Sequence, residues 1–215
     1  MKMSDALVII REFDTAMDDA IGLYLDAKSA MVKFADLQTE LQIANAAQFG
    51  MSIAELDNLS FTYGTGDPND PQSLHLHATT QGNLKARNSK GGKNHLLLGQ
   101  RFIVDLYTFW EDSYRTQIAE ALNRDRDTIR SNIFGDLRLM RNSIIQHRGI
   151  ALPEIIRCKS LVWFGPGDII DISDDSRFHS IITETRRWLE AFGSEVSGSA
   201  PGLIDRHGPS GHRYM

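Results

Sequence analysis

The sequence predicts a mainly α-helical fold, an antiparallel helical bundle with one small β-hairpin before the last helix. Four segments carry apolar residues at alternating spacings of three and four, the period of an amphipathic helix. Only residues 160–173, "SLVWFGPGDIIDIS", predict a hairpin, since two β-prone runs flank a Gly-Pro-Gly-Asp turn. A chain of 215 residues can bury one core, so we expect a single helical domain over residues 1–194 and a flexible tail over 195–215.

The composition is that of a water-soluble globular protein. It is 41% hydrophobic and 24% charged, and no run approaches the ~18 apolar residues that a membrane span needs. Acidic residues interrupt the short apolar stretch near the N-terminus, which does not resemble a secretory signal. A single cysteine, Cys158, cannot form an internal disulfide. We therefore expect a cytoplasmic protein without membrane contact.

The first predicted helix runs from Asp5 to about Gln48. Its heptad-like stripe favours packing on another long helix or at a subunit interface. Residues 1–57 hold ten acidic and four basic residues, which suits a protein interface better than RNA contact. The stripe consists of Ile10, Phe13, Met17, Ala20, Tyr24, Ala27, Met31 and Phe34.

The segment that follows changes character. Residues 60–95 are rich in Gly, Asn, Asp and Pro without a sustained period, which predicts a long mobile insertion. A second helix is expected over 96–122 and a third from about Asp127, ended by Gly149 and Pro153. After the hairpin, Asp174 or Asp175 is expected to cap a last helix that runs to about Phe192.

Several residues outside the third helix have the right type for chemistry but the wrong context. His75 and His77 have no carboxylate or thiolate at a metal-binding spacing, and residues 90–94 lack the glycine and hydroxyl of a phosphate loop. Cys158 precedes an apolar run, where cysteines are usually inert. His207 and His212 lie in the tail. No metal and no cofactor are predicted.

The third predicted helix, "DLRLMRNSIIQHRGIALP" from residue 136, concentrates positive charge. Residues 124–148 hold six arginines against three aspartates. At 100° per residue, Arg138, Arg141 and Arg148 share a face, and His147 lies about 120° around from Arg141. The plain alternative is a solvated, salt-bridged arginine face with a histidine at the helix end, where the dipole favours a cation.

The residue order resembles the motif of the HEPN superfamily of helical nucleases and nucleotide-binding proteins. In this motif an arginine and a polar residue, here Arg141 and Asn142, precede a histidine near a helix end, here His147. "DLYTFWEDSYRTQIA" is similar to the preceding helix of that family, and "LVWFGPGDIIDIS" to a hairpin in some bacterial members. The resemblance covers about residues 96–192. The insertion at 60–95 and the acidic first helix have no counterpart in it.

The resemblance implies a homodimeric, metal-independent endoribonuclease that cleaves single-stranded RNA through its own 2′-hydroxyl. Arg141, Asn142 and His147 would be catalytic, and Arg138, Arg148 and Arg130 would bind the RNA backbone. A histidine can exchange a proton near neutral pH, and an arginine can grip two phosphate oxygens. Family tendency adds a toxin or anti-phage defence role and an antitoxin-like partner.

Two other functions stay open. The first is a HEPN-like module without catalysis, which would bind a nucleotide or nucleic acid or scaffold an assembly, with His147 as a structural residue. The second is a helical regulator that does not bind nucleic acid at all. Cleavage that survives EDTA and disappears in His147→Ala separates the enzyme from the binding module, and RNA binding at low salt excludes the regulator.

Overall fold

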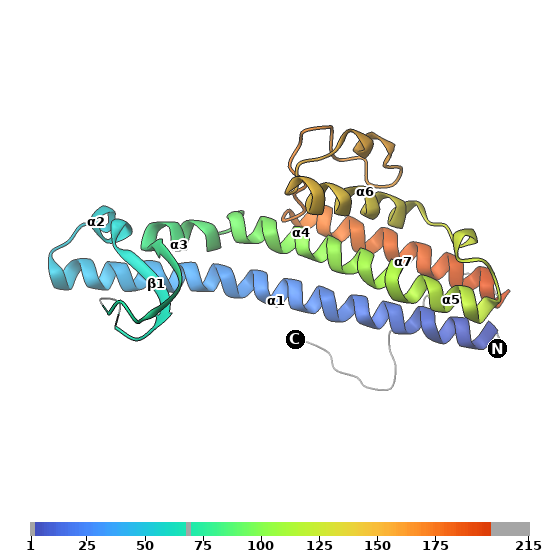
Figure 1. Ribbon diagram of the computed structural model, residues 1–215, viewed down its shortest axis with the longest axis horizontal. Coiled ribbons are helices and arrows are strands. Elements are labelled where there is room, and N and C mark those ends of the chain that lie inside the picture. The colour runs from blue at the N-terminus through green and yellow to red at the C-terminus, as the bar shows by residue number, and fades with distance from the viewer. Residues whose placement is uncertain (1–2, 68–69, 199–215) are drawn as a thin grey trace. The chain divides into compact units, whose positions relative to one another are not determined.

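The computed structural model describes residues 3–67 and 70–198, and it confirms a mainly helical fold (Figure 1). No helix in these two ranges is long and apolar enough to cross a membrane. Most of the predicted tail, with His207 and His212, lies outside the described residues, while residues 195–197 continue the last helix. In chain order the helices and strands are α1 (Met3–Phe49), α2 (Ile53–Asn58), β1 (Ser60–Thr65), β2 (Leu74–Thr80), α3 (Gln81–Asn88), α4 (Lys93–Thr108), a π-helical turn (Phe109–Tyr114), α5 (Arg115–Leu122), α6 (Asn132–His147) and α7 (Asp175–Ser197).

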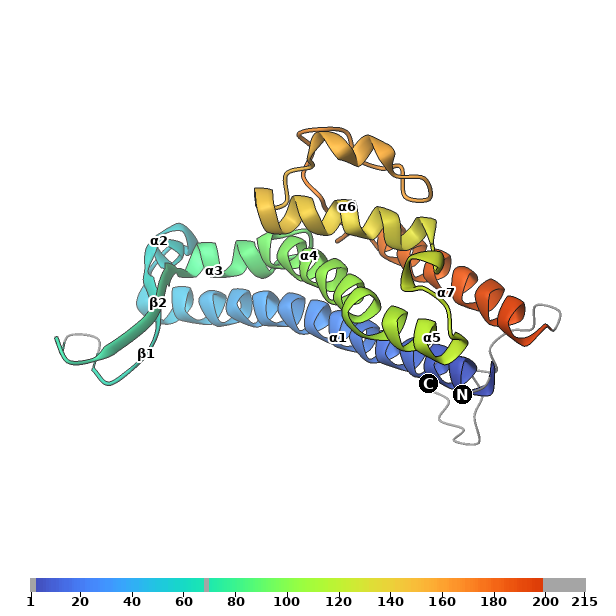
Figure 2. The ribbon, with the colours of Figure 1, turned by 45° about the vertical axis from the view of Figure 1, so that its right-hand side comes forward.

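The chain divides into two compact units, and the first contains the start of α1 together with everything from Gly99 onward. In this unit the first part of α1, α5 and α7 lie side by side, and α6 packs on α7 (Figures 1 and 2). Phe13 of α1 is fully buried, with its ring centroid 4.9 Å from that of Tyr114 and 5.7 Å from that of Phe134. The first part of the apolar stripe predicted for this helix, with Ile10, Phe13 and Met17, is therefore buried in this core.

The helix predicted over 96–122 forms as a continuous run of α4, the π-helical turn and α5. The π-helical turn changes the helical phase in the middle of the run. It carries Trp110, which is buried and stacks on Phe134 with ring centroids 4.2 Å apart. The predicted start of the last helix is also confirmed, because the Asp174 carboxylate accepts hydrogen bonds from the backbone N–H groups of Ser176 and Arg177.

The second unit spans residues 24–98. Its polar centre is Gln42 on α1, whose Nε2 donates hydrogen bonds of 3.0 Å to the Asp57 and Gln81 side chains. Lys85 of α3 forms an ion pair of 2.7 Å with Asp57. These contacts join α1, α2 and α3. The assignment of residues 1–194 to a single domain stays a prediction.

The prediction of an insertion without regular structure over 60–95 is wrong, because this stretch contains β1, β2, α3 and the start of α4. The strands pair antiparallel, with Ser60 opposite Thr80 and Phe61 opposite Thr79. The Thr80 hydroxyl accepts a hydrogen bond from the Asn83 backbone N–H and caps α3. The many Gly, Asn, Asp and Pro residues made the two strands hard to predict from sequence. The strands are stabilised by pairing with each other, which a local pattern does not reveal.

The hairpin predicted at 160–173 is also wrong, although its turn forms. The Asp168 N–H donates to the Gly165 carbonyl at 3.1 Å, but the two flanking runs do not pair with each other. Instead Ile169 pairs with Ile150, and the Ile170 N–H donates to the Gly149 carbonyl at 2.7 Å. Residues 168–170 therefore pair with the segment directly after α6, and not with residues 160–164 as predicted.

Candidate active site

The residues of the motif lie on α6, which begins at Asn132 and ends at His147. Ile133, Leu137 and Met140 are almost fully buried and hold one face of α6 against the core. The start near Asp127 is instead a short 3-10 turn, Arg126–Thr128, separated from α6 by the three residues 129–131. The opposite face of α6 carries the polar residues.

Arg141 and Asn142 form one polar unit. The Arg141 side chain is partly buried, and its Nη1 donates a hydrogen bond of 3.3 Å to Asn142 Oδ1. Its Nε is buried and makes no hydrogen bond within the described residues. Because the Arg141 side chain is only partly buried, the rest of its guanidinium can donate hydrogen bonds to an external anion.

His147 is the last residue of α6, and it is exposed. Within residues 3–67 and 70–198 its imidazole forms no hydrogen bond or ion pair, so both ring nitrogens are available to a ligand. Arg148 follows with a left-handed φ of 55° and ends the helix. The prediction that Arg148 shares a helical face with Arg138 and Arg141 is therefore wrong, because the 100° rotation per residue stops at His147.

The chain after His147 is held firmly. Gly149 has a φ of 85°, a conformation that glycine adopts readily. A Cβ atom at this position would collide with the side-chain amide of Gln100, whose Nε2 donates to the Ile170 carbonyl at 3.0 Å. The Ser143 hydroxyl accepts a hydrogen bond from the Leu152 N–H at 3.1 Å. These contacts fix the direction in which the chain leaves α6 and so place His147.

A cavity of about 600 Å³, which we call the α6 cleft, opens beside the first half of α6. It is lined by two predicted RNA-binding residues, Arg130 and Arg138, and by three further basic residues, Arg115, Arg157 and Lys159. A neighbouring groove of about 400 Å³ is lined by Arg138, Asn142 and Arg157 among others. Neither cavity is lined by Arg141, His147 or Arg148.

Asp136 explains why Arg157 and Lys159 lie near α6. Its buried carboxylate accepts hydrogen bonds from the backbone N–H groups of Lys159, Ser160 and Leu161, at 2.9, 2.6 and 2.8 Å. In the sequence, Asp136 is one acid among the arginines of the motif helix, and this position alone does not indicate its structural role. Its partners are backbone groups more than twenty residues away, which no local pattern reveals.

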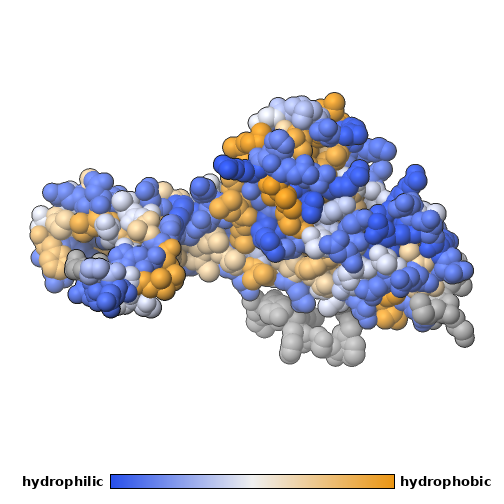
Figure 3. Space-filling view, viewed as in Figure 1, coloured by the Kyte–Doolittle hydropathy of each residue, from blue (hydrophilic) through white to orange (hydrophobic). Residues whose placement is uncertain are grey.

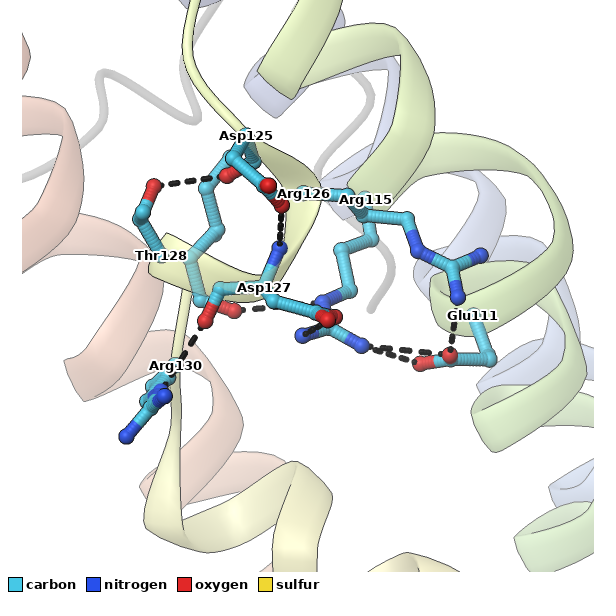
Figure 4. Close-up of polar contacts among 8 residues, drawn as sticks. Glu111, Arg115, Asp125, Arg126, Asp127, Thr128 and Arg130 are labelled. Carbon is cyan, nitrogen blue, oxygen red and sulfur yellow. Dashed lines mark hydrogen bonds and ion pairs between the residues drawn. The ribbon is translucent and has the colours of Figure 1, made fainter.

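The other arginines of this region divide into two groups. The Glu111 carboxylate lies between Arg115, at 3.0 Å, and Arg126, at 3.4 Å (Figure 4). Arg124 forms an ion pair of 3.2 Å with Glu195. Arg124 and Arg126 therefore belong to a salt-bridged surface, the plain alternative to RNA binding. Arg130 extends away from the Glu111 cluster, with its Nε donating to the Asp127 carbonyl at 2.9 Å (Figure 4).

The remaining candidates lie elsewhere. His75 and His77 are exposed on β2, and Nε2 of His77 lies 2.6 Å from Nη1 of Arg87. Within the described ranges no three His, Cys, Asp or Glu residues are grouped as a metal site would need. Cys158 is buried, and its burial together with the Asp136 charge raises the pKa of its thiol to about 12. This environment disfavours the reactive thiolate.

Comparisons with protein-family models, with curated proteins and with solved structures find no match to this chain.

Proposed function

We propose that this protein is a metal-independent endoribonuclease whose active site is built on Arg141, Asn142 and His147. The observation that carries the proposal is the environment of two motif side chains, Arg141 and His147. The Arg141 guanidinium is oriented by Asn142 and has a buried Nε without an acceptor, and the His147 imidazole is exposed and has no partner within the described residues. Both are suited to an anionic ligand that reacts by proton transfer.

The proposed reaction breaks a phosphodiester without water. The 2′-oxygen attacks phosphorus, and one imidazole takes the 2′-hydroxyl proton as this P–O bond forms. The bond from phosphorus to the 5′-oxygen breaks, and a second imidazolium donates its proton to that oxygen. Arg141 stabilises the additional negative charge on the phosphoryl oxygens. The products are a 2′,3′-cyclic phosphate and a 5′-hydroxyl.

Two imidazoles require two protomers, because His147 is the only motif histidine in the chain. Exposed apolar residues lie on both sides of it in the sequence: Ile145 is 51% exposed and Ile150 is 42% exposed. Ile169, which pairs with Ile150, is 53% exposed. Hydrophobic residues gather on the surface of the segment that follows α6 (Figure 3). A second copy of this chain on this surface would bury these residues and bring the two histidines together.

The test of the activity is cleavage of a mixed single-stranded RNA in EDTA. We expect the wild-type protein to cleave, and His147→Ala to lose at least ~100-fold in rate, the lower range for general acid–base catalysis. Arg187→Ala is the control, because Arg187 is 66% exposed and pairs with its neighbour Glu184 at the surface. Equal loss in both variants would contradict the proposal.

The test of the dimer uses a charge at its proposed centre. Ile150→Glu should give monomers in analytical ultracentrifugation and abolish cleavage, since a buried unpaired carboxylate opposes association. Leu23→Glu places the same charge on a residue of α1 that is 70% exposed and should change neither property. A dimer that persists in Ile150→Glu would show that the protomers meet elsewhere.

The binding module without catalysis is the second candidate, and the α6 cleft favours it. This cleft is lined by five basic side chains but not by the proposed catalytic residues Arg141 and His147. A toxin or anti-phage role and an antitoxin-like partner stay proposals from the resemblance.

A further inference from the structure

The α6 cleft has an excess of available positive charge. Arg138, Arg157 and Lys159 are exposed, and within the described ranges their charged groups form no ion pair. The two acids of the cleft are already occupied: Glu111 pairs with Arg115 and Arg126, and Asp136 accepts backbone N–H groups. This excess of positive charge favours an anionic ligand in the cleft.

The start of α6 adds to this charge. Ser131 occupies the N-cap position in the cleft but makes no capping hydrogen bond, and its Oγ is buried without a partner. The first N–H groups of α6 thus lack the side-chain acceptor that usually satisfies them. An anion in the cleft would interact favourably with this end of the helix.

Aromatic residues form part of the cleft lining, which we call the aromatic wall. Tyr107 and Trp188 belong to it and are partly exposed. Trp110 and Phe134 also line the cleft and stack with an interplanar angle of 7°, and Trp188 packs edge-on against both rings. Aromatic rings and basic side chains in one cleft can bind a planar base and its phosphate together.

We propose that the α6 cleft binds one nucleotide of a single-stranded RNA, at a distinct subsite beside the cleavage motif. Arg138, Arg157 and Lys159 hold the phosphate, and the base lies against Tyr107 and Trp188. The cavity of about 600 Å³ is of the size that encloses small ligands. Asp136 is a positioning residue, because it fixes the segment that carries Lys159 against α6. The choice of RNA as ligand rests on the proposed ribonuclease function.

The test measures binding separately from cleavage. The probe is a short fluorescein-labelled 2′-O-methyl oligoribonucleotide, which lacks the attacking hydroxyl, and the readout is fluorescence anisotropy over a range of salt concentrations. The variant is Arg157→Ala with Lys159→Ala. Its control, Arg101→Ala with Arg187→Ala, removes the same charge from side chains that are 72% and 66% exposed and lie outside the cleft.

We expect the cleft variant to bind at least ~10-fold more weakly than the wild type, because each lost contact is charge-assisted. The slope of log K against log salt should become shallower by up to about 0.7, the value for one neutralised phosphate of a single strand. The control should bind within about twofold of the wild type, since its charges are remote and screened. Equal losses in the two double variants would overturn the proposal.

An oligomer of the same length without bases tests the aromatic wall. The wild-type protein should bind it at least ~5-fold more weakly, since stacking of a base on an aromatic ring contributes that much or more. Equal binding of both oligomers would overturn the nucleotide assignment. If the wild type binds as expected but cleaves no RNA, only the ribonuclease proposal fails, because the probe cannot be cleaved.

Discussion

The Asp136 carboxylate, near the start of α6, accepts hydrogen bonds of 2.9 and 3.0 Å from the backbone N–H of Lys159. Ser160 and Leu161 donate to the same carboxylate. One buried acid therefore fastens three successive residues to the motif helix, and the position of a wall of the α6 cleft depends on it.

Removal of this carboxylate should destabilise the protein. Asp136→Ala leaves three backbone N–H groups without their acceptor, and we expect the free energy of unfolding to fall by about 3 kcal/mol. Asp136→Asn keeps one acceptor oxygen and should lose less. Urea denaturation measures both. Asp19→Ala, at an exposed position of α1, is the control and should stay within about 0.5 kcal/mol of the wild type. An Asp136→Ala variant as stable as this control would contradict the role of the carboxylate.

The ion pairs between α1 and α7 should contribute to the stability of the protein, and the residue next to Arg186 provides a control. Arg186 of α7 pairs with Asp14, whose side chain is 8% exposed, and with Asp18. Arg186→Ala leaves the Asp14 carboxylate buried without its cation, so we expect a loss of about 2–3 kcal/mol in urea denaturation.

Arg187→Ala removes the same charge one residue later, but this side chain pairs with Glu184 at the surface. A surface pair contributes little, so the loss should stay below about 0.5 kcal/mol. The double variant Asp14→Ala with Arg186→Ala should recover part of the Arg186→Ala loss. Equal stability of the two single arginine variants would show that the Asp14 pair does not hold the helices together.

The pKa of Cys158 predicts a slow thiol. Burial, assisted by the Asp136 charge, raises this pKa from 9.0 to about 12. At about pH 8 the folded protein should therefore resist a thiol reagent such as DTNB and react only after urea denaturation. Rapid labelling of the native protein would contradict the buried environment.

The same pKa predicts a pH dependence of stability. The raised pKa means that the unfolded chain releases the Cys158 proton at a lower pH than the folded protein does. Between about pH 9 and pH 12 the unfolded state binds fewer protons, so stability falls as the pH rises. Over the first pH unit above 9 the wild type should lose about 1 kcal/mol more than Cys158→Ala. Equal slopes in both proteins would show that the thiol does not titrate differently on unfolding.

The helices could be predicted from sequence because their cause is local. The three-and-four spacing of Ile10, Phe13 and Met17, and the Asp174 cap, are visible within a few residues, and each forms as predicted. The pairing of strands could not be predicted in this way, because it depends on which other segment of the chain each strand meets. Residues 168–170 pair with the segment after His147 and not with 160–164, and β1 and β2 stabilise each other within a stretch rich in turn residues.

The candidate site shows the same division. Arg141, Asn142 and His147 could be selected as a motif, and Arg130 and Arg138 as basic residues of one helix region. Arg157 and Lys159 could not be selected, because only the Asp136 contact brings their segment to α6. The prediction put Arg148 on the face of Arg138 and Arg141 because it extended the 100° helical rotation to residue 148. In the structure α6 ends at His147, one residue before Arg148.

The most direct test of the proposed activity is the chemical identity of the RNA ends after incubation in EDTA. We expect fragments with 2′,3′-cyclic phosphate and 5′-hydroxyl ends from the wild-type protein and no fragments from His147→Ala, which should keep the wild-type melting temperature. Fragments from both proteins, fragments with 3′-hydroxyl and 5′-phosphate ends, or no cleavage by the wild type would contradict it.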